Sequence, residues 1–465
     1  MTDLQRFASE FVESTRDFVF VRPEDRLLIL RPNRTHYLNA TACEMLQRLY
    51  RQSVVDVPAL VGEMALEYGV EREQVARDLE ELLKTLNGLL RDDYSEATRL
   101  KFTPFGSHEA KYPVLSEIAL TYRCQHRCPF CYADAPRRGA EVGEMTTEEV
   151  CRVIDRIWDE AKVPTVSFTG GEPTLRDDLP DLIRYAKSRG MRTNLITNGY
   201  RLADETLARR LVESGLDSAQ VSIEGPTAET HDAVTQTPGS FERSLQGIRH
   251  LRACGIHTHT NTTICPENRD HVIGMPDLAR TLGHDYLSMN MVIRTGGAAD
   301  GSADTIGYGD IGGIVEPILQ RCRQLGLRLV WYSPVPYCVF NPVTIGLGSN
   351  SCAAADGLLS VAPDGQVLPC SSFETGVGNL LTESFETVWN RRTARYWRQK
   401  EFLPPVCADC DLKRICCGAC PLYWDEQQGF DELPGARKGR IGFLRQAEWR
   451  LKRRWLGRLK GVNLQ

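Results

Sequence analysis

The sequence has no continuous run of about 18 apolar residues, so no segment is expected to span a bilayer. Its first seven residues lack the basic start and apolar core of a secretory signal peptide. It also lacks a strong charge bias, because 61 Asp and Glu residues oppose 56 Lys and Arg residues, for a net charge of −5. No overall positive charge is therefore available to attract nucleic acid. We expect a protein that binds neither a membrane nor nucleic acid.

Cysteine, in contrast, is abundant, with 16 residues. Without a signal peptide, the disulfide framework of a secreted protein is not expected, and thiols that bind metal in a reducing compartment are the better interpretation. We therefore expect a cytoplasmic, oxygen-sensitive protein. Five cysteines lie in predicted helices or strands and are interpreted as buried apolar side chains without a further role: Cys43, Cys151, Cys254, Cys265 and Cys322.

Three further cysteines share one short loop. Cys124, Cys128 and Cys131 follow the strand-like run 115–121 with the spacing C-x3-C-x2-C. Three thiolates on one loop can hold three irons of a [4Fe–4S] cube and leave the fourth iron open for another ligand. A zinc site is the alternative, but zinc loops usually bring cysteines in C-x2-C pairs with a fourth ligand of their own. The spacing favours the iron–sulfur cluster.

At 465 residues the chain is expected to form two or three domains. Residues 1–95 predict a winged-helix-like α+β domain, with a solvated linker over 96–112. Its strands are expected at 18–22, 27–30 and 35–38, and its helices after Asn39 or Thr41, over 57–68 and over 71–89. Such a domain often binds DNA, but the last helix is acidic and would repel phosphates.

Residues 113–325 alternate between strand-like and helix-like segments. Strands are expected at 115–121, 165–168, 192–196, 219–223, 257–264 and 286–293. Helices are expected near 146–161, 178–189, 203–214, 241–254, 271–282 and 311–325. Six consecutive βα units predict an α/β fold with a parallel sheet, as in a partial (β/α)6 barrel of the TIM type. The chemistry of such a fold lies at the carboxyl ends of its strands.

The second of these strands ends in Thr169-Gly170-Gly171-Glu172-Pro173. Two glycines let the backbone approach a ligand closely, and a carboxylate can accept a hydrogen bond from an ammonium group. Other strand ends also carry polar side chains, whose alternative role is ordinary loop capping. These residues are Asn198, Ser222, Glu224, Asn261, Thr263 and Arg294.

The cysteine loop, with Phe130 before its last cysteine, and the Gly-Gly-Glu-Pro strand end together resemble the signature of the radical S-adenosylmethionine (SAM) superfamily. The resemblance implies that the open iron chelates SAM and that the reduced cluster cleaves it to a 5′-deoxyadenosyl radical. It further implies a set of SAM-binding residues: Gly170, Gly171, Glu172, Phe130, Asn198, Ser222, Glu224 and Arg294.

Residues 326–430 carry a second group of cysteines. Cys352 precedes Gly365 by twelve intervening residues and Cys370 follows after four more, and a C-x2-C-x5-C-x3-C run comprises Cys407, Cys410, Cys416 and Cys420. A zinc ribbon could use some of these ligands. Downstream of a radical SAM core, however, the pattern resembles a SPASM domain with auxiliary [4Fe–4S] clusters.

That resemblance implies a first auxiliary cluster on Cys352, Cys370 and Cys420, with Cys338 as the fourth ligand. It implies a second on Cys407, Cys410 and Cys416. No cysteine follows Cys420, so the family's usual last ligand is missing. Cys417, an oxygen ligand such as Asp425, or a site left open for substrate are the alternatives. Ser371, where sulfatase-maturing relatives place an acidic base, argues against that activity.

The N-terminal domain resembles the RiPP recognition element, on the basis of its strands, the turn 38–42 into a helix and the pattern from Tyr68 to Leu82. The resemblance implies that a leader peptide binds as an added strand at a sheet edge. The basic residues of 431–465 predict a C-terminal helix that packs one face on the protein.

Together these resemblances predict a radical SAM oxidoreductase of the sactipeptide or ranthipeptide maturase type, which forms a thioether or C–C cross-link in a ribosomally made precursor peptide. A reductant such as ferredoxin or flavodoxin would supply electrons. One alternative is an enzyme of cofactor biosynthesis that oxidises or decarboxylates a haem or quinone precursor. A second is a non-enzymatic metal- or DNA-binding regulator.

Overall fold

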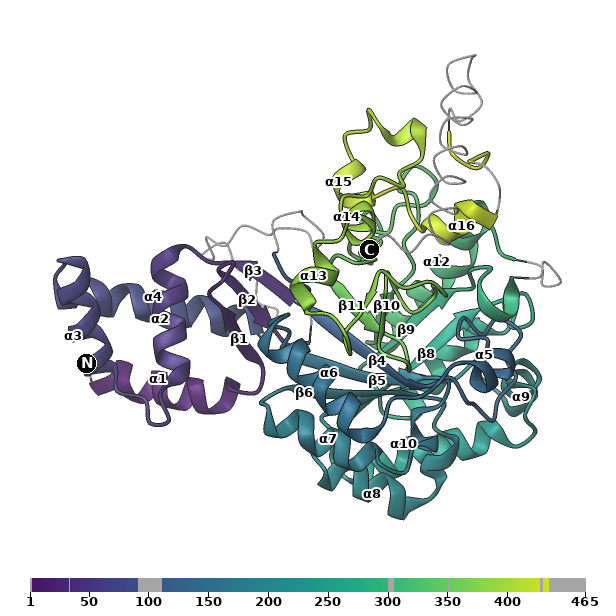
Figure 1. The fold of residues 1–465 in the computed structure, drawn as a ribbon, viewed down its shortest axis with the longest axis horizontal. Coiled ribbons are helices and arrows are strands. Elements are labelled where there is room, and N and C mark those ends of the chain that lie inside the picture. The colour runs from purple at the N-terminus through teal and green to yellow at the C-terminus, as the bar shows by residue number, and fades with distance from the viewer. Residues whose placement is uncertain are drawn as a thin grey trace. The chain divides into compact units, whose positions relative to one another are not determined.

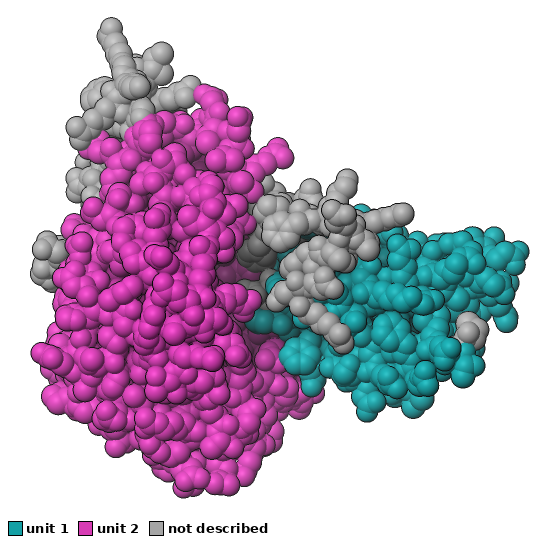
Figure 2. Space-filling model, turned by 180° about the vertical axis from the view of Figure 1, so that it is seen from behind, with its two compact units in different colours: residues 1–115 teal, residues 116–465 magenta. Residues whose placement is uncertain are grey.

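The computed structural model describes residues 2–32, 34–90, 111–299, 305–349, 351–426 and 430–434. The chain forms two compact units, Met1–Leu115 and Ser116–Gln465 (Figures 1 and 2). The linker expected over 96–112 and the helix expected over 431–465 lie almost entirely outside the described residues. No helix among the described residues is both long and apolar enough to cross a membrane.

The first unit combines a small antiparallel sheet, in the order β1-β2-β3, with four helices. The strands are β1 (Val19–Arg22), β2 (Leu27–Leu30) and β3 (Arg34–Tyr37), and the helices are α1 (Thr2–Thr15), α2 (Ala40–Arg51), α3 (Val57–Tyr68) and α4 (Arg72–Leu90). All but α1 match the expected elements. The sequence carries a signal for α1, because its buried residues Leu4, Ala8, Phe11, Val12 and Thr15 recur at helical spacing.

Side-chain caps set the helix boundaries of this unit. Asn39 accepts a hydrogen bond from the backbone N–H of Ala42 at 2.7 Å, and Asp56 accepts one from Ala59 at 2.9 Å. These bonds satisfy amide groups that have no partner inside a helix. Most apolar side chains of these helices and strands pack in one core, and Leu27 and Ile29 of β2 form a second, smaller cluster with Val114.

The second unit is built on seven parallel strands that follow one another in chain order. They are β4 (Leu115–Thr121), β5 (Thr165–Gly170), β6 (Arg192–Thr197), β7 (Ser218–Ser222), β8 (His257–Ile264), β9 (Tyr286–Met291) and β10 (Arg328–Trp331). This sheet confirms the α/β class and the partial barrel. The last strand, β10, lies beyond the barrel boundary expected at residue 325 and pairs in parallel with β9.

Helices connect these strands, and Figure 1 shows α7, α8 and α10 along the outside of the sheet. Their bounds are α5 (Ala135–Glu141), α6 (Thr147–Asp159), α7 (Leu179–Ser188), α8 (Glu205–Glu213), α9 (Ala228–Thr235), α10 (Ser240–Ala253), α11 (Met275–Thr281) and α12 (Tyr308–Leu325). Short 3-10 turns are η1 (Pro173–Leu175), η2 (Tyr200–Ala203), η3 (Val272–Gly274) and η4 (Gly296–Ala298). Because each crossover returns the chain to the same edge, all carboxyl strand ends face one side.

The cysteine-rich segment continues the sheet beyond β4 through β11 (Leu358–Val361), β12 (Gln366–Leu368) and β13 (Gly378–Asn379). Its helices are α13 (Phe385–Trp389), α14 (Arg392–Arg398), η5 (Pro405–Cys407), α15 (Lys413–Cys416) and α16 (Pro421–Glu426). Hydrogen bonds hold it to the barrel, from Met145 N to the carbonyl of Pro363 at 2.7 Å and from Phe385 N to Glu160 at 2.6 Å. Both cysteine groups therefore belong to one compact unit.

Candidate active site

The Cys124–Cys131 loop begins directly after β4, at the carboxyl edge of the sheet. Backbone hydrogen bonds fix it from three sides. Glu172 N donates to the carbonyl of Arg123 at 2.8 Å, Arg127 N to Thr235 O at 3.0 Å, and Gly297 N to Cys131 O at 2.9 Å. The segment after β5, the end of α9 (Ala228–Thr235) and the turn after β9 therefore hold the loop in place.

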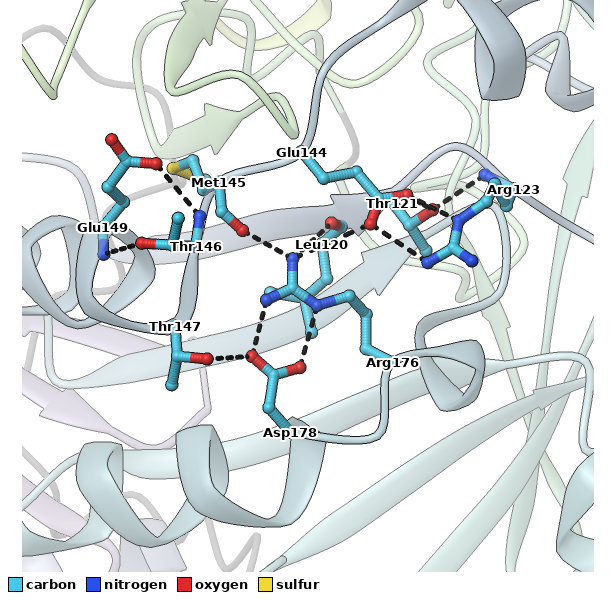
Figure 3. Close-up of polar contacts among 10 residues, drawn as sticks. All are labelled: Leu120, Thr121, Arg123, Glu144, Met145, Thr146, Thr147, Glu149, Arg176 and Asp178. Carbon is cyan, nitrogen blue, oxygen red and sulfur yellow. Dashed lines mark hydrogen bonds and ion pairs between the residues drawn. The ribbon is translucent and has the colours of Figure 1, made fainter.

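A polar network anchors the residues just before Cys124 (Figure 3). Glu144 accepts two hydrogen bonds from the Arg123 guanidinium, at 2.7 and 3.0 Å, and one from the Thr121 hydroxyl. Arg176 donates to Met145 O at 2.7 Å and forms an ion pair with Asp178. Because the Arg176 side chain is largely buried, these contacts stabilise the loop more than exposed ion pairs would.

The two glycines after β5 allow the backbone of that strand end to lie against the residues that precede Cys124. Gly170 has φ +142°, a conformation that L side chains rarely adopt. A Cβ atom at Gly171 would lie 2.6 Å from the carbonyl oxygen of Tyr122 and would overlap that of Arg123. This close approach of the two backbone segments positions the cysteine loop, a role separate from any contact of the glycines with SAM.

Glu172 is fully buried beside Cys124. Its Oε1 accepts hydrogen bonds from Thr174 N, Thr174 Oγ1 and Thr197 Oγ1, and its Oε2 accepts one from Asn198 N at 2.8 Å. Burial raises the pKa of Glu172, and these hydrogen bonds partly oppose the shift. A carboxylate offers about four acceptor positions, so Oε2 retains room for a further donor such as an ammonium group.

Asn198, at the end of β6, contacts the cysteine loop directly. Its Nδ2 donates to the Sγ of Cys124 at 3.6 Å, and its Oδ1 accepts from Gln125 Nε2 at 3.0 Å. The amide therefore orients a thiol of the loop in addition to any contact with SAM. Phe130 packs in an apolar cluster with Val234 and Val292.

Glu224, just after β7, carries a strongly perturbed carboxyl group. It is 4% exposed, and burial raises its pKa to about 8. Its Oε2 accepts from Thr263 N at 2.9 Å, and its charge acts on the thiol of Cys128. Ser222 ends the same strand, half-buried. The sequence places these two residues on one strand end, and the structure brings Glu224 to the cysteine loop.

Several buried polar atoms at this edge have no hydrogen-bond partner among the described residues: Oε1 of Gln125, Nε of Arg294 and Oγ1 of Thr295. Such atoms are rare in folded proteins because burying them unpaired costs free energy. A polar ligand at the edge would satisfy them, so the residues present fit SAM. Burial also lowers the pKa of His126 to about 4, which keeps the ring neutral in the loop.

The three loop thiols lie close enough to influence one another. Burial raises the pKa of Cys124 to about 12, and the charges of Glu172 and Cys131 add to the effect. Burial, followed by the charge of Glu224 and then the thiols of Cys131 and Cys124, raises the pKa of Cys128. Buried thiolates need a compensating positive charge, and iron supplies it. The donor set therefore fits a cluster.

Zinc fits the described residues less well. Among them, no three His, Cys, Asp or Glu side chains converge closely enough to ligate a single metal ion. A zinc ion needs four ligands at about 2.0–2.3 Å from one point. A cube distributes its cysteines over separate irons, so they stand farther apart.

The C-terminal cysteines fall into two groups. The first contains Cys352, Cys370 and Cys420, because burial and then the thiols of Cys352 and Cys420 raise the pKa of Cys370. The second contains Cys407, Cys410 and Cys416. Cys338 is expected in the first group. It lies instead beside the second, because the turn that carries it follows β10 and packs on Cys416.

Sequence analysis missed two features of the site. One is the Gly296-Gly297 turn after β9, whose contact with Cys131 a pair of adjacent glycines could have indicated. The other is Glu117 on β4, which accepts hydrogen bonds from Ser360 at 2.6 Å and from Ser371. A half-buried carboxylate thus reaches Ser371, although the residue directly after Cys370 is a serine and not an acid. Burial raises the pKa of Glu117.

Replacing Gly171 by Ala should destabilise the loop, because the new methyl group would overlap two carbonyl oxygens. We expect a loss of about 1–3 kcal/mol in the free energy of unfolding, measured by denaturant titration, together with a lower iron content after reconstitution. Gly143→Ala is the matched control, since nothing lies within 4 Å of a Cβ atom there. Equal stability of the two variants would contradict the close-contact role.

Replacing Glu224 by Gln should stabilise the metal-free chain at high pH only. The folded pKa of Glu224, about 8, exceeds the unfolded value. The wild-type chain therefore has its full free energy of unfolding at low pH and loses part of it as pH rises to about 8. Gln stays neutral throughout. Relative to wild type, we expect the variant to gain up to about 4 kcal/mol between pH 5 and pH 9. A pH-independent difference between the two chains would show that burial does not perturb this carboxyl group.

Comparison with known families agrees with this geometry. The model of the radical SAM superfamily matches residues 118–279, and that of an iron-sulfur cluster-binding domain, SPASM, matches residues 352–411. The model of coenzyme PQQ synthesis protein D, PqqD, matches residues 26–89. These matches confirm the three resemblances that the sequence motifs indicated.

Characterised relatives fall into two classes. An AdoMet-dependent heme synthase of Nitratidesulfovibrio vulgaris is 28% identical over 314 residues, which cover 64% of this chain and 85% of the relative. A PqqA peptide cyclase of Rhodopseudomonas palustris is 30% identical over 326 residues, which cover 66% of this chain and 82% of the relative. Both classes of relative are enzymes, so the non-enzymatic alternative is not supported.

Solved structures share the fold. Streptococcus suis SuiB bound to its precursor peptide SuiA superposes with a TM-score of 0.65 at 16% identity, over 88% of this chain and 96% of that chain. The enzyme anSMEcpe with bound AdoMet superposes with a TM-score of 0.54 at 16% identity, over 73% and 98%. The chain therefore belongs to the radical SAM superfamily and is an enzyme that combines a SAM-binding [4Fe–4S] core, a SPASM domain for auxiliary clusters and a PqqD-type domain.

Proposed function

We propose that this enzyme oxidatively modifies a ribosomally synthesised precursor peptide by forming a thioether or C–C cross-link. The observation that carries the proposal is the PqqD-type domain at residues 26–89 in the same chain as the radical SAM and SPASM segments. A recognition domain for a peptide leader is useful only to an enzyme whose substrate has a leader. The similarity to SuiB supports the proposal. The match covers 88% of this chain, which is more than the second compact unit, Ser116–Gln465, so it also includes part of the first unit.

A cluster held by Cys124, Cys128 and Cys131, with SAM bound to it, would supply a 5′-deoxyadenosyl radical for hydrogen abstraction from the substrate. The chain's own residues make that chemistry selective. Backbone hydrogen bonds hold the loop around Cys124–Cys131, and its three cysteines are only partly exposed, which limits access of water and fixes the position of bound SAM. Glu172 Oε2, Asn198 and Arg294 are the groups proposed to orient SAM.

The sheet of the first unit offers an edge for the leader. Within the described residues β3 pairs with β2 only, so its outer edge presents backbone N–H and C=O groups to an added strand. Main-chain pairing provides affinity, and side chains beside the strand provide selectivity. We propose that the leader binds at an edge of this sheet and that a ferredoxin or flavodoxin delivers the electrons.

A cofactor-biosynthesis activity on a haem precursor is the second candidate. The observation in its favour is the similarity to AdoMet-dependent heme synthases, at 28–29% identity. A porphyrin substrate does not require the PqqD-type domain, so the two candidates differ in what the first unit does.

Anaerobically reconstituted enzyme with dithionite and SAM should release 5′-deoxyadenosine, detected by liquid chromatography. Replacing Cys124, Cys128 and Cys131 together by Ala should abolish the product and remove about a third of the iron, because one of three clusters is lost. The control is Cys254→Ala, a residue outside all three cysteine groups. Release of 5′-deoxyadenosine by the triple variant would contradict the assigned cluster.

Deleting residues 1–95 should abolish modification of a leader-bearing peptide, because it removes the residues that match the PqqD model and most of the first unit. SAM cleavage without peptide should continue, which separates loss of recognition from loss of folding. Mass spectrometry of the peptide measures the outcome. If the truncated enzyme modifies the peptide as fast as the full chain, or if it acts on a porphyrin instead, the leader-binding proposal fails.

A further inference from the structure

The second auxiliary cysteine group is one ligand short. Cys407, Cys410 and Cys416 provide three thiolates, and no cysteine follows Cys420 in the chain. The match to the SPASM family model covers residues 352–411 and so ends before Cys416. A [4Fe–4S] cube accepts four, so the remaining iron needs a ligand from another part of the fold, or stays open.

The segment that follows β10 lies against this group. Tyr337 N donates a hydrogen bond to the Sγ of Cys416 at 3.3 Å, and the Cys416 thiol contacts the carbonyl oxygen of Val335 at 3.9 Å. Cys416 is buried, so this contact is part of the packed interior. Backbone N–H groups that point at a sulfur favour its thiolate form.

Cys338 stands on a turn one residue beyond that contact. Val339 N and Phe340 N both donate to the carbonyl of Pro336, at 2.9 and 3.0 Å, which fixes the turn. The thiols of Cys416 and Cys410 act electrostatically on Cys338, and those of Cys416, Cys338 and Cys410 act on Cys407. Four thiols from two separate segments therefore gather at one place.

Cys417 is directed elsewhere. It adopts φ 49°, at the end of α15, and its thiol contacts the carbonyl oxygen of Arg414 at 3.6 Å. Its electrostatic neighbours are Lys400, Cys352 and Asp356, which belong to the surroundings of the first group. The Lys400 ammonium in turn donates to the carbonyl of Cys352 at 2.6 Å. Cys417 therefore lies on the side of the first group and does not complete the second.

We propose that Cys338 is the fourth thiolate of the second auxiliary cluster. The Cys338 thiol loses its proton to solvent, and the thiolate binds the one iron that lacks a cysteine ligand. A cluster ligated entirely by cysteine has no iron free for substrate, so the second cluster would carry electrons and would not bind peptide. The inference rests on the auxiliary clusters of the SPASM domain and is independent of which substrate the enzyme modifies.

The test compares Cys338→Ala, Cys410→Ala and the double variant in the full-length reconstituted enzyme. Both cysteines are exposed, so their replacement is not expected to impair folding. Each single variant should lose up to about a third of the iron and sulfide, and should alter the same component of the reduced EPR spectrum. The double variant should match either single variant, since all three lack ligands of one cluster. Cys254→Ala should leave iron content and spectrum unchanged.

Two results would overturn the proposal: an unchanged iron content and spectrum in Cys338→Ala, or a loss in the double variant about twice that of either single variant. Alkylation of the intact holoenzyme gives a second measure. Because its thiol is exposed when unligated, Cys338 should resist iodoacetamide in the wild-type enzyme and react after Cys410→Ala. Reaction of Cys338 in the fully loaded wild-type enzyme would also refute the assignment. None of these readouts depends on peptide, so they remain informative if the proposed substrate is wrong.

Discussion

The close backbone contact between the ends of β4 and β5 is the constraint on which the site depends. Gly171 N donates to Thr121 O at 2.7 Å and Glu172 N to Arg123 O at 2.8 Å, and no side chain larger than hydrogen fits at Gly171 without displacing carbonyl groups. The contact sets where Cys124 begins its loop and where Glu172 faces it. One local packing requirement thus positions both the cluster ligands and a carboxylate expected to bind SAM.

Burial gives the same edge its electrostatic character. The carboxyl groups of Glu172 and Glu224 both have raised pKa values because they are buried at the sheet edge. Thiols there are also disfavoured as anions until iron compensates their charge. Burying these carboxyl and thiol groups costs free energy in the metal-free chain. Binding of the cluster should therefore stabilise this edge of the sheet.

The two auxiliary groups differ in how the chain supplies them. Tertiary contacts bring Cys352, Cys370 and Cys420 together near buried Lys400, whereas a short run provides Cys407, Cys410 and Cys416 and the turn after β10 adds Cys338. In the proposed arrangement, the second cluster is closed and acts in electron transfer. The first group remains adjacent to Glu117 on β4, within the unit that contains the radical SAM core.

The sequence alone determined the features that are local in the chain. The C-x3-C-x2-C loop and the βα alternation each depend on neighbouring residues, so their spacing was sufficient to predict the cluster and the partial barrel. The Gly-Gly-Glu-Pro strand end, taken with the loop, indicated SAM through the resemblance to a known family. The sequence also predicted the strands and three of the helices of the first unit. Only the tertiary structure decided that Cys338 joins Cys416 and that Glu117 reaches Ser371. These pairs are separated by 78 and 254 residues, and no local pattern encodes the crossovers that bring such distant segments into contact.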